Sequence, residues 1–155
     1  EYCVIQDRVG VVDFAHTPDA LEKVLDTLTA ILPKGASIIG VVGAGGDRDS
    51  GKRPLMAAAA IKYCKKLVLT SDNPRHEKPE NIIAQMYEGI PSERRANVFC
   101  NVDRREAIRK AVTLSTQGDF VLVAGKGHEA YQQIGDEKFP FDDVTELRLA
   151  LEQIR

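Results

Sequence analysis

The sequence has no excess of basic charge and no long apolar run, and each absence excludes a class of protein. Lysine and arginine number 21, aspartate and glutamate 23, and the net charge is -2. A general nucleic-acid-binding protein carries a basic excess, so we expect no nucleic-acid partner. The balanced charge does not exclude a local site for a small anion. No apolar segment approaches the ~18–20 residues of a membrane span, and no signal segment opens the chain. These absences predict a cytoplasmic protein without a membrane partner.

Ligands for metals and nucleophiles for catalysis are also scarce. The histidines number 3, and neither His76 nor another histidine stands at a metal-ligand spacing from His128 and Glu129. No Ser/His/Asp or Cys/His nucleophile pattern is legible, so we predict no catalytic residue and no metal ligand in this chain. The cysteines form no CxxC pair, which predicts three reduced thiols in a cytosolic domain (Cys3, Cys64 and Cys100).

Strand and helix patterns alternate along the 155 residues, a length that suits one domain over residues 1–155. Because the chain starts with Glu1 in a strand pattern, we expect a piece of a longer protein. Apolar runs such as Ser37–Val42 predict strands buried on both faces of a parallel sheet. We expect strands over 3–5, 10–14, 37–42, 66–70, 97–100, 119–124, 131–134 and 138–141, and helices over 18–32, 53–64, 79–88, 104–115 and 143–154.

This alternation predicts an α/β domain with a doubly wound, mostly parallel, Rossmann-like sheet and a β-hairpin edge. Thr17 is predicted to cap the first helix, and Asp103 with Glu106 forms a capping-box pattern for another. Asp143 and Glu146 are predicted to cap the last helix.

Four loops that follow predicted strands carry unusual polar residues. They span residues 13–18, 45–49, 72–75 and 125–129. In open α/β sheets ligands bind beyond the carboxyl ends of the strands, and parallel strands end at the same edge. The sequence therefore predicts one ligand site built from four loops.

The glycine-rich loop resembles two phosphate-binding patterns and fits neither. Residues 46–52 match G-x-x-x-x-G-K, but Arg53 stands where a hydroxyl would hold Mg²⁺. Asp47 and Asp49 would also face the phosphates. The dinucleotide pattern fails at Arg48, where its last glycine belongs. Two interpretations remain, a flexible turn or a loop whose glycines let Arg48 and the backbone approach a small anionic ligand, and we favour the second.

The segment Asp72-Asn73-Pro74-Arg75 predicts recognition of an amino acid. Pro74 favours an extended Asn73, and the turn would present Asp72, Asn73 and Arg75 together. An arginine fork pairs with a carboxylate through two hydrogen bonds, and a nearby aspartate suits an ammonium. The alternative is a capped turn with a solvated arginine.

Together the four loops resemble the C-terminal domain of the Mur ligases, in the branch that adds the third amino acid of the bacterial peptidoglycan stem peptide. The stretches that match are VDFAHTPDALEKVL, GAGGDRDSGKRPLM, TSDNPRHEKPENI and VAGKGHEAYQ, with FDD before the last helix. They span nearly the whole chain. The only departures are Phe14, where the family often has tyrosine, and Ala44, where some members have cysteine.

The resemblance implies roles for individual residues. Arg75 stands where lysine-adding relatives have another residue, which implies meso-diaminopimelate as the amino acid. Its pocket would comprise six residues (Arg48, Asp72, Asn73, Arg75, Gly125 and Glu129). The loop of Asp13 and His16 would face ATP, although a histidine in this position, taken alone, is more often a surface or packed residue than a ligand.

The resemblance also implies a reaction and partners. The family joins an amino acid to a carboxylate of a UDP-N-acetylmuramoyl peptide, through an acyl phosphate formed with ATP. ATP and Mg²⁺ would be bound mainly by a central domain outside this chain, so the isolated chain should be inactive. Its partners would be meso-diaminopimelate, the UDP-N-acetylmuramoyl dipeptide and the enzyme's own central and N-terminal domains. The alternatives are a lysine-adding or folylpolyglutamate-type ligase domain, or a non-catalytic amino-acid or nucleotide-binding module.

Overall fold

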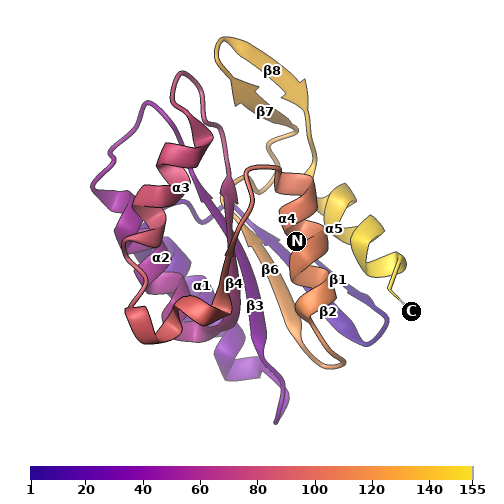
Figure 1. Cartoon of the computed structure of the whole chain (residues 1–155). Coiled ribbons are helices and arrows are strands. Elements are labelled where there is room, and N and C mark those ends of the chain that lie inside the picture. Colours follow the sequence, from indigo (N-terminus) through magenta and orange to yellow (C-terminus); the bar gives the residue numbers. More distant parts are fainter. Residues whose placement is uncertain (155) are drawn as a thin grey trace.

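A six-stranded sheet forms the centre of the computed structural model, which describes residues 1–154 (Figure 1). The strand order is β1-β2-β6-β3-β4-β5, and every pair is parallel except the antiparallel edge pair β1–β2. This confirms the predicted mostly parallel, doubly wound sheet with a hairpin at its edge. The strand bounds are β1 Tyr2–Ile5, β2 Arg8–Asp13, β3 Ile38–Ala44, β4 Cys64–Ser71, β5 Val98–Cys100 and β6 Phe120–Ala124.

Helices cover both faces of this sheet. Helices α1, α2 and α3 pack on one face and α4 and α5 on the other, as Figure 1 shows. A separate antiparallel hairpin, β7–β8, follows β6. The bounds are α1 Pro18–Ile31, α2 Lys52–Tyr63, α3 Pro79–Tyr87, α4 Arg104–Leu114, α5 Asp143–Glu152, β7 Tyr131–Ile134 and β8 Glu137–Pro140, and a 3₁₀ turn spans Ser92–Asn97.

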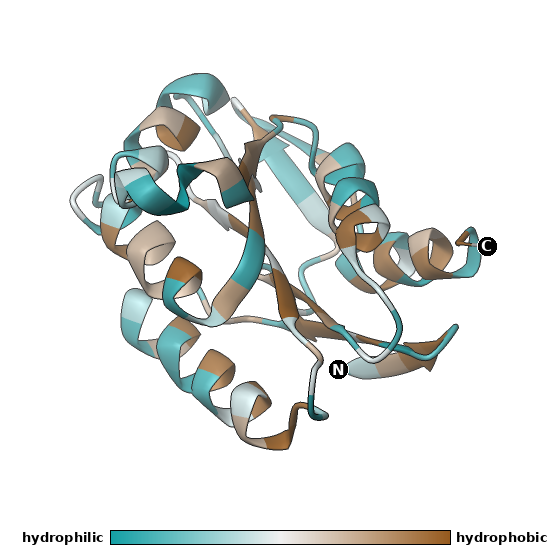
Figure 2. Ribbon diagram, turned by 60° about the horizontal axis from the view of Figure 1, so that its bottom comes forward, coloured by the Kyte–Doolittle hydropathy of each residue, from teal (hydrophilic) through white to brown (hydrophobic). Residues whose placement is uncertain are grey.

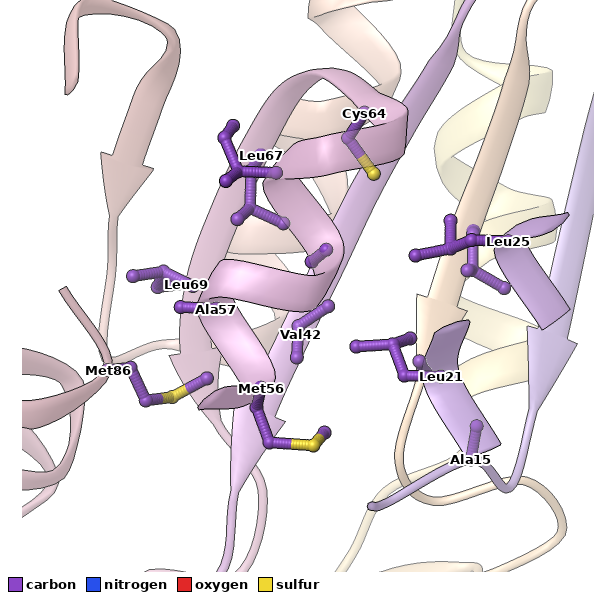
Figure 3. Packing of buried hydrophobic residues seen from close by; sticks show 14 of the residues in the cluster. Ala15, Leu21, Leu25, Val42, Met56, Ala57, Cys64, Leu67, Leu69 and Met86 are labelled. Carbon is purple, nitrogen blue, oxygen red and sulfur yellow. The ribbon is translucent and has the colours of Figure 1, made fainter. Parts of the chain in front are cut away.

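The strands in the middle of the sheet are apolar on both faces, which is why they read as continuous hydrophobic runs. In β3, Val42 faces the α1–α3 side and Val41 faces the α4–α5 side. The middle strands are mainly brown in Figure 2, whereas the helices mix hydrophilic and hydrophobic residues. Leu21 and Leu25 of α1 are fully buried and point toward the strand of Val42 (Figure 3). Burying such a side chain contributes about 1.5–3 kcal/mol.

Two of the three predicted helix caps are present. Thr17 Oγ1 accepts from Ala20 N (3.2 Å), and Asp103 accepts from Glu106 N (3.2 Å). The prediction that Asp143 and Glu146 cap the last helix was wrong. Asp142 occupies the N-cap position of α5, and Asp143 is the first residue of the helix and fully buried inside the domain.

Asp143 instead pairs with Arg104 in the interior. Arg104 Nε and Nη2 donate to the two carboxylate oxygens at 2.8 and 2.7 Å. Burial alone would lower the pKa of Arg104, but the charge of Asp143 raises it above its ordinary value. The remaining guanidinium donors reach the carbonyls of Ser71 and Ala124, so the pair ties α4 and α5 to the ends of β4 and β6.

Candidate functional site

The four polar loops meet at the carboxyl edge of the sheet, as predicted. The strands that precede them, β2, β3, β4 and β6, are parallel neighbours. Gly125 N donates to Asp13 O (3.0 Å), and Gly46 N donates to Asn73 O (2.8 Å). The ammonium of Lys126 lies 3.0 Å from Asp72 Oδ1, which joins the last loop to the third. Each loop is thus held directly by another.

The glycine-rich loop lies against the turn after β4. A Cβ on Gly46 would stand 1.8 Å from Pro74 O, so only glycine permits this approach. A Cβ on Gly45 would stand 2.8 Å from Arg75 Nη1 and 3.6 Å from Arg48 Cγ, so both arginine side chains lie close to Gly45. The loop therefore brings together parts of two arginine side chains that are 27 positions apart in sequence (75 − 48).

The hairpin β7–β8 holds the backbone of Arg75. This residue has φ +52, a left-handed conformation that is uncommon for residues other than glycine. Its N–H donates to Gln133 O (3.1 Å), and its carbonyl accepts from Gly135 N (2.7 Å). Arg75 Nη1 also donates to Gly46 O (2.9 Å), so the hairpin holds the backbone of Arg75 and the glycine-rich loop holds its guanidinium. Arg48 is exposed and donates to Asp47 O.

Buried polar groups lie beneath the two arginines. Asn73 Oδ1 accepts from Lys126 Nζ (2.7 Å) and from Gln133 N (2.9 Å), and Asn73 Nδ2 donates to Glu129 Oε1 (3.2 Å). Asn73 and Lys126 are 3% and 0% exposed, whereas Glu129 is partly exposed. The joined loops therefore carry the supported carboxylate of Glu129 together with two arginines, a set of groups that suits a ligand with both a carboxylate and an ammonium.

Gly125 completes this group of residues. It has φ +122, a conformation that side chains rarely adopt, and the Cβ of a larger residue would meet Asp72 Oδ2 at 3.4 Å. All six predicted amino-acid-site residues therefore lie in the joined loops.

The Asp72 carboxylate already faces a cation of its own chain. Sequence reasoning assigned this aspartate to a ligand ammonium, but Lys126 Nζ lies 3.0 Å from it. Asp72 is also 8% exposed, and its backbone carbonyl accepts from Gln132 Nε2 (2.8 Å). A ligand ammonium at Asp72 would share this carboxylate with Lys126, and the assignment of Asp72 to a ligand stays a prediction.

Arg53 clamps the glycine-rich loop to the turn. It is 1% exposed and donates to Glu77 through Nη1 (3.0 Å) and Nη2 (2.6 Å), and Nη2 also reaches Gly45 O (3.0 Å). Hydrogen bonds from Arg53 hold the pKa of Glu77 below its ordinary value. Because this guanidinium fills the position where a phosphate-binding loop has a hydroxyl, the loop does not fit Mg²⁺ and phosphates.

His76 joins three segments at the surface. Its Nδ1 lies 2.7 Å from Asp47 Oδ2 and its Nε2 lies 2.8 Å from Asp136 Oδ1, in the glycine-rich loop and the hairpin turn respectively. The hydrogen bond to Asp47, then that to Asp136, raises the pKa of His76. The hydrogen bond from His76 lowers the pKa of Asp47.

Asp13 and His16 lie in the loop after β2. Asp13 Oδ2 accepts from Ala15 N (2.8 Å), which closes a tight turn before α1. His16 is exposed, and its Nδ1 lies 2.9 Å from Phe14 O. Asp13 O accepts from Gly125 N, so this loop adjoins the amino-acid-site loops through backbone contact.

The part of the chain that the structure describes also bears on metal binding, on membrane crossing and on hollows in the surface. Within residues 1–154, no three His, Cys, Asp or Glu side chains gather as metal ligands. None of the helices described combines the length and the apolar character that crossing a membrane requires. A hollow of about 500 Å³ lies beside Arg8 and Arg109, and it does not involve the four loops.

Comparison with known proteins decides the family. The model of the "Mur ligase, glutamate ligase domain" matches residues 3–127. The chain belongs to the Mur ligase family. It is 53% identical over 145 residues to UDP-N-acetylmuramoyl-L-alanyl-D-glutamate--2,6-diaminopimelate ligase of Cytophaga hutchinsonii, which covers 93% of this chain and 29% of that protein. The ligase of the same name from Listeria innocua is 49% identical over 148 residues, covering 96% and 29%.

Solved structures agree with this assignment. A UDP-N-acetylmuramoyl-L-alanyl-D-glutamate--2,6-diaminopimelate ligase superposes with a TM-score of 0.90 at 47% identity, covering 98% of this chain and 31% of that one. Folylpolyglutamate synthase from Thermotoga maritima, at 18% identity and a TM-score of 0.59, shares the fold. The chain thus spans under a third of the length of these diaminopimelate ligases.

Several residues that organise the site were missed by sequence reasoning. Lys126, Arg53 and Glu77 read as ordinary charged residues, and only their burial and contacts distinguish them. The hairpin was expected, but its contacts with the turn of Arg75 were not. No local pattern signals them, because each contact joins segments far apart in sequence.

Proposed function

We propose that this chain is the amino-acid-binding C-terminal domain of an ATP-dependent ligase. The ligase adds meso-diaminopimelate to UDP-N-acetylmuramoyl-L-alanyl-D-glutamate in cytoplasmic bacterial peptidoglycan synthesis. Residues 1–155 act as one domain of this enzyme, next to its central and N-terminal domains. The observation that carries the proposal is that the side chains of Arg75 and Arg48 both approach Gly45, in the same joined loops as the partly exposed Glu129.

In this proposal the loops hold and orient the amino acid. Arg75 pairs with the distal carboxylate through a two-pronged contact, for which four guanidinium N–H groups stay available beside the one that Nη1 donates to Gly46 O. Glu129, supported by Asn73, receives the distal ammonium. Arg48 holds the other carboxylate at the rim. Gly125 closes the site from below, and Asp72 supports it through Lys126.

The chemistry that ATP and Mg²⁺ supply is assigned outside this chain. The glycine-rich loop does not fit phosphates and Mg²⁺, because Arg53 fills the position of the required hydroxyl and Asp47 and Asp49 line the loop. We propose only that the loop of Asp13 and His16 faces the nucleotide. The isolated chain is accordingly expected to show neither ligase nor ATPase turnover.

The alternatives differ in what they demand of Arg75. A lysine-adding ligase would leave this guanidinium without a carboxylate partner, and breaking such a pair costs about 2–5 kcal/mol. A folylpolyglutamate-type ligase would have no need of the Asp72–Arg75 turn. A binding module without chemistry would bind the amino acid but form no product.

A ligation assay with the full-length enzyme tests the proposal. The enzyme is given ATP, Mg²⁺ and UDP-N-acetylmuramoyl-L-alanyl-D-glutamate with either meso-diaminopimelate, lysine or glutamate. We expect product with meso-diaminopimelate and about 100-fold lower kcat/KM with lysine, which corresponds to about 2.7 kcal/mol. Equal use of lysine, or product with glutamate alone, would reject the proposed substrate. Binding without product would identify a module that lacks chemistry.

A further inference from the structure

Lys126 is a fully buried lysine whose ammonium is surrounded by residues of the candidate site. It is 0% exposed. Nζ donates to Asn73 Oδ1 at 2.7 Å and to Tyr131 O at 3.0 Å, and it lies 3.0 Å from Asp72 Oδ1 and 3.7 Å from Glu129 Oε1. Lysine is almost never fully buried unless it is paired, so this position calls for a specific explanation.

We infer that Lys126 is the positioning residue of the amino-acid site, which sets the orientation of the Asn73 amide and the charge available to a ligand at Glu129. This inference rests on the proposed function and deepens it. With no exposed surface, Lys126 does not itself contact a ligand. It acts on the ligand through the neighbours that it holds.

The first part of the argument concerns orientation. Asn73 Oδ1 receives two donors, Lys126 Nζ and Gln133 N, which forces the amide nitrogen to point the other way. That nitrogen then donates to Glu129 Oε1. Without the ammonium, Asn73 Oδ1 loses one of its two donors and keeps Gln133 N. The amide of Asn73, and the Glu129 carboxylate that it contacts, are then held less firmly.

The second part concerns charge. Asp72 and Glu129 carry two negative charges, and Lys126 supplies one positive charge between them at 3.0 and 3.7 Å. Arg104 also acts on both carboxylates, but its charge is balanced by Asp143, so one negative charge is left over in this group and Glu129 is its more exposed member. A ligand that brings a single ammonium completes the balance. This predicts selection for an amino acid with an ammonium beside the carboxylate that Arg75 binds.

The third part concerns the hairpin β7–β8. Lys126 Nζ donates to Tyr131 O, and Gln132 and Gln133 contact the backbone or side chains of Asp72 and Asn73. The match to the family model ends at residue 127, so these hairpin residues lie beyond it. Lys126 thus connects the segment that the family model matches to the hairpin that supports the turn.

Steady-state kinetics of the full-length enzyme test the inference. Lys126→Met keeps an unbranched side chain as far as Cε and removes the ammonium. We expect the KM for the amino acid that the wild type uses to rise about 10- to 100-fold, the range found when the groups that support a ligand contact are removed. The KM for ATP should change less than about twofold, since the contacts of the Lys126 ammonium are to Asn73, Tyr131, Asp72 and Glu129 and not to Asp13 or His16. Lys138→Met, at an exposed lysine of the same hairpin, is the matched control and should leave both values unchanged.

A pair of further variants separates positioning from folding. Lys126→Met leaves Asp72 buried without a counterion, so it also destabilises the protein. Asp72→Asn/Lys126→Met removes that charge and should recover the thermal midpoint. Its KM for the amino acid should nevertheless stay about tenfold above that of Asp72→Asn alone, because Asn73 still lacks its donor. A double variant whose KM for the amino acid equals that of Asp72→Asn alone would overturn the inference. An unchanged KM for the amino acid in Lys126→Met would also overturn it.

The same measurements keep the two proposals distinct. If the wild type uses another amino acid instead of meso-diaminopimelate, the proposed function fails, and the role of Lys126 is judged on the amino acid that is used. If the wild type uses meso-diaminopimelate and Lys126→Met has the same KM, only the inference about Lys126 fails.

Discussion

Replacing Arg75 by alanine should remove the preference for meso-diaminopimelate over lysine in the full-length enzyme. In the structure one of the five guanidinium N–H groups is used on Gly46 O, which leaves four for a ligand carboxylate within the described residues. A charge-assisted hydrogen bond contributes about 1.5–3 kcal/mol in net terms. At about 1.4 kcal/mol per tenfold, Arg75→Ala should lower kcat/KM for meso-diaminopimelate roughly 10- to 100-fold.

Lysine should respond differently to the same substitution. It has no distal carboxylate, so the wild-type site leaves Arg75 unpaired when lysine binds, and Arg75→Ala removes that penalty. Use of lysine should therefore fall far less, or rise. Arg75→Lys should also lose most of the activity with meso-diaminopimelate, because an ammonium does not make the two-pronged contact.

The assay is product formation with each amino acid at varied concentration. Arg148→Ala, at an exposed arginine of α5, is the matched control and should leave both substrates unaffected. Because Arg75 also holds the glycine-rich loop through Gly46 O, a purely structural role would reduce both substrates equally. An equal loss for meso-diaminopimelate and lysine would therefore refute the assignment.

Three further predictions concern the nucleotide loop, the pH dependence and the core. In the full-length enzyme, Asp13→Ala or His16→Ala should raise the KM for ATP more than the KM for the amino acid, and the reverse ranking would overturn their assignment. The pKa of His76 is raised in the folded chain, so its contribution to stability is present below its unfolded value of about 6.5 and is lost as the pH rises through the folded value. The urea midpoints of the wild type and His76→Gln should accordingly differ more at about pH 5.5 than at about pH 9, and an equal difference at both would contradict this. Arg104→Ala should cost about 3–5 kcal/mol in urea denaturation because it leaves Asp143 buried and unpaired, whereas Arg104→Met/Asp143→Leu should be near neutral, and a small loss in the single variant would argue against a tightly coupled pair.

The sheet, the helices and the meeting of the four loops were predictable from the sequence, because they follow from local patterns. Buried strands read as apolar runs, and parallel strands place their following loops at one edge. Thr17 was identified as a cap because its hydroxyl serves residues only three positions away.

The interior charge pairs were not predictable, because they depend on distant partners. Asp143 fits the pattern of a helix cap, yet it lies against Arg104, 39 positions earlier in the chain. Lys126 lies in a glycine-flanked loop that favours an exposed position, and only the fold brings Asp72 and Asn73 to it. The same holds for Arg75, whose left-handed backbone is held by the hairpin.

A crystal structure of the full-length enzyme with meso-diaminopimelate bound tests the central claim most directly. The measurement is the distance from the distal carboxylate of the ligand to the guanidinium of Arg75, together with that from the distal ammonium to Glu129. Our account predicts hydrogen bonds of about 2.7–2.9 Å at both contacts, with Lys126 enclosed beneath them. A ligand whose distal end lies away from Arg75, or whose ammonium is held elsewhere than at Glu129, would contradict the assignment of this domain as the one that selects the amino acid.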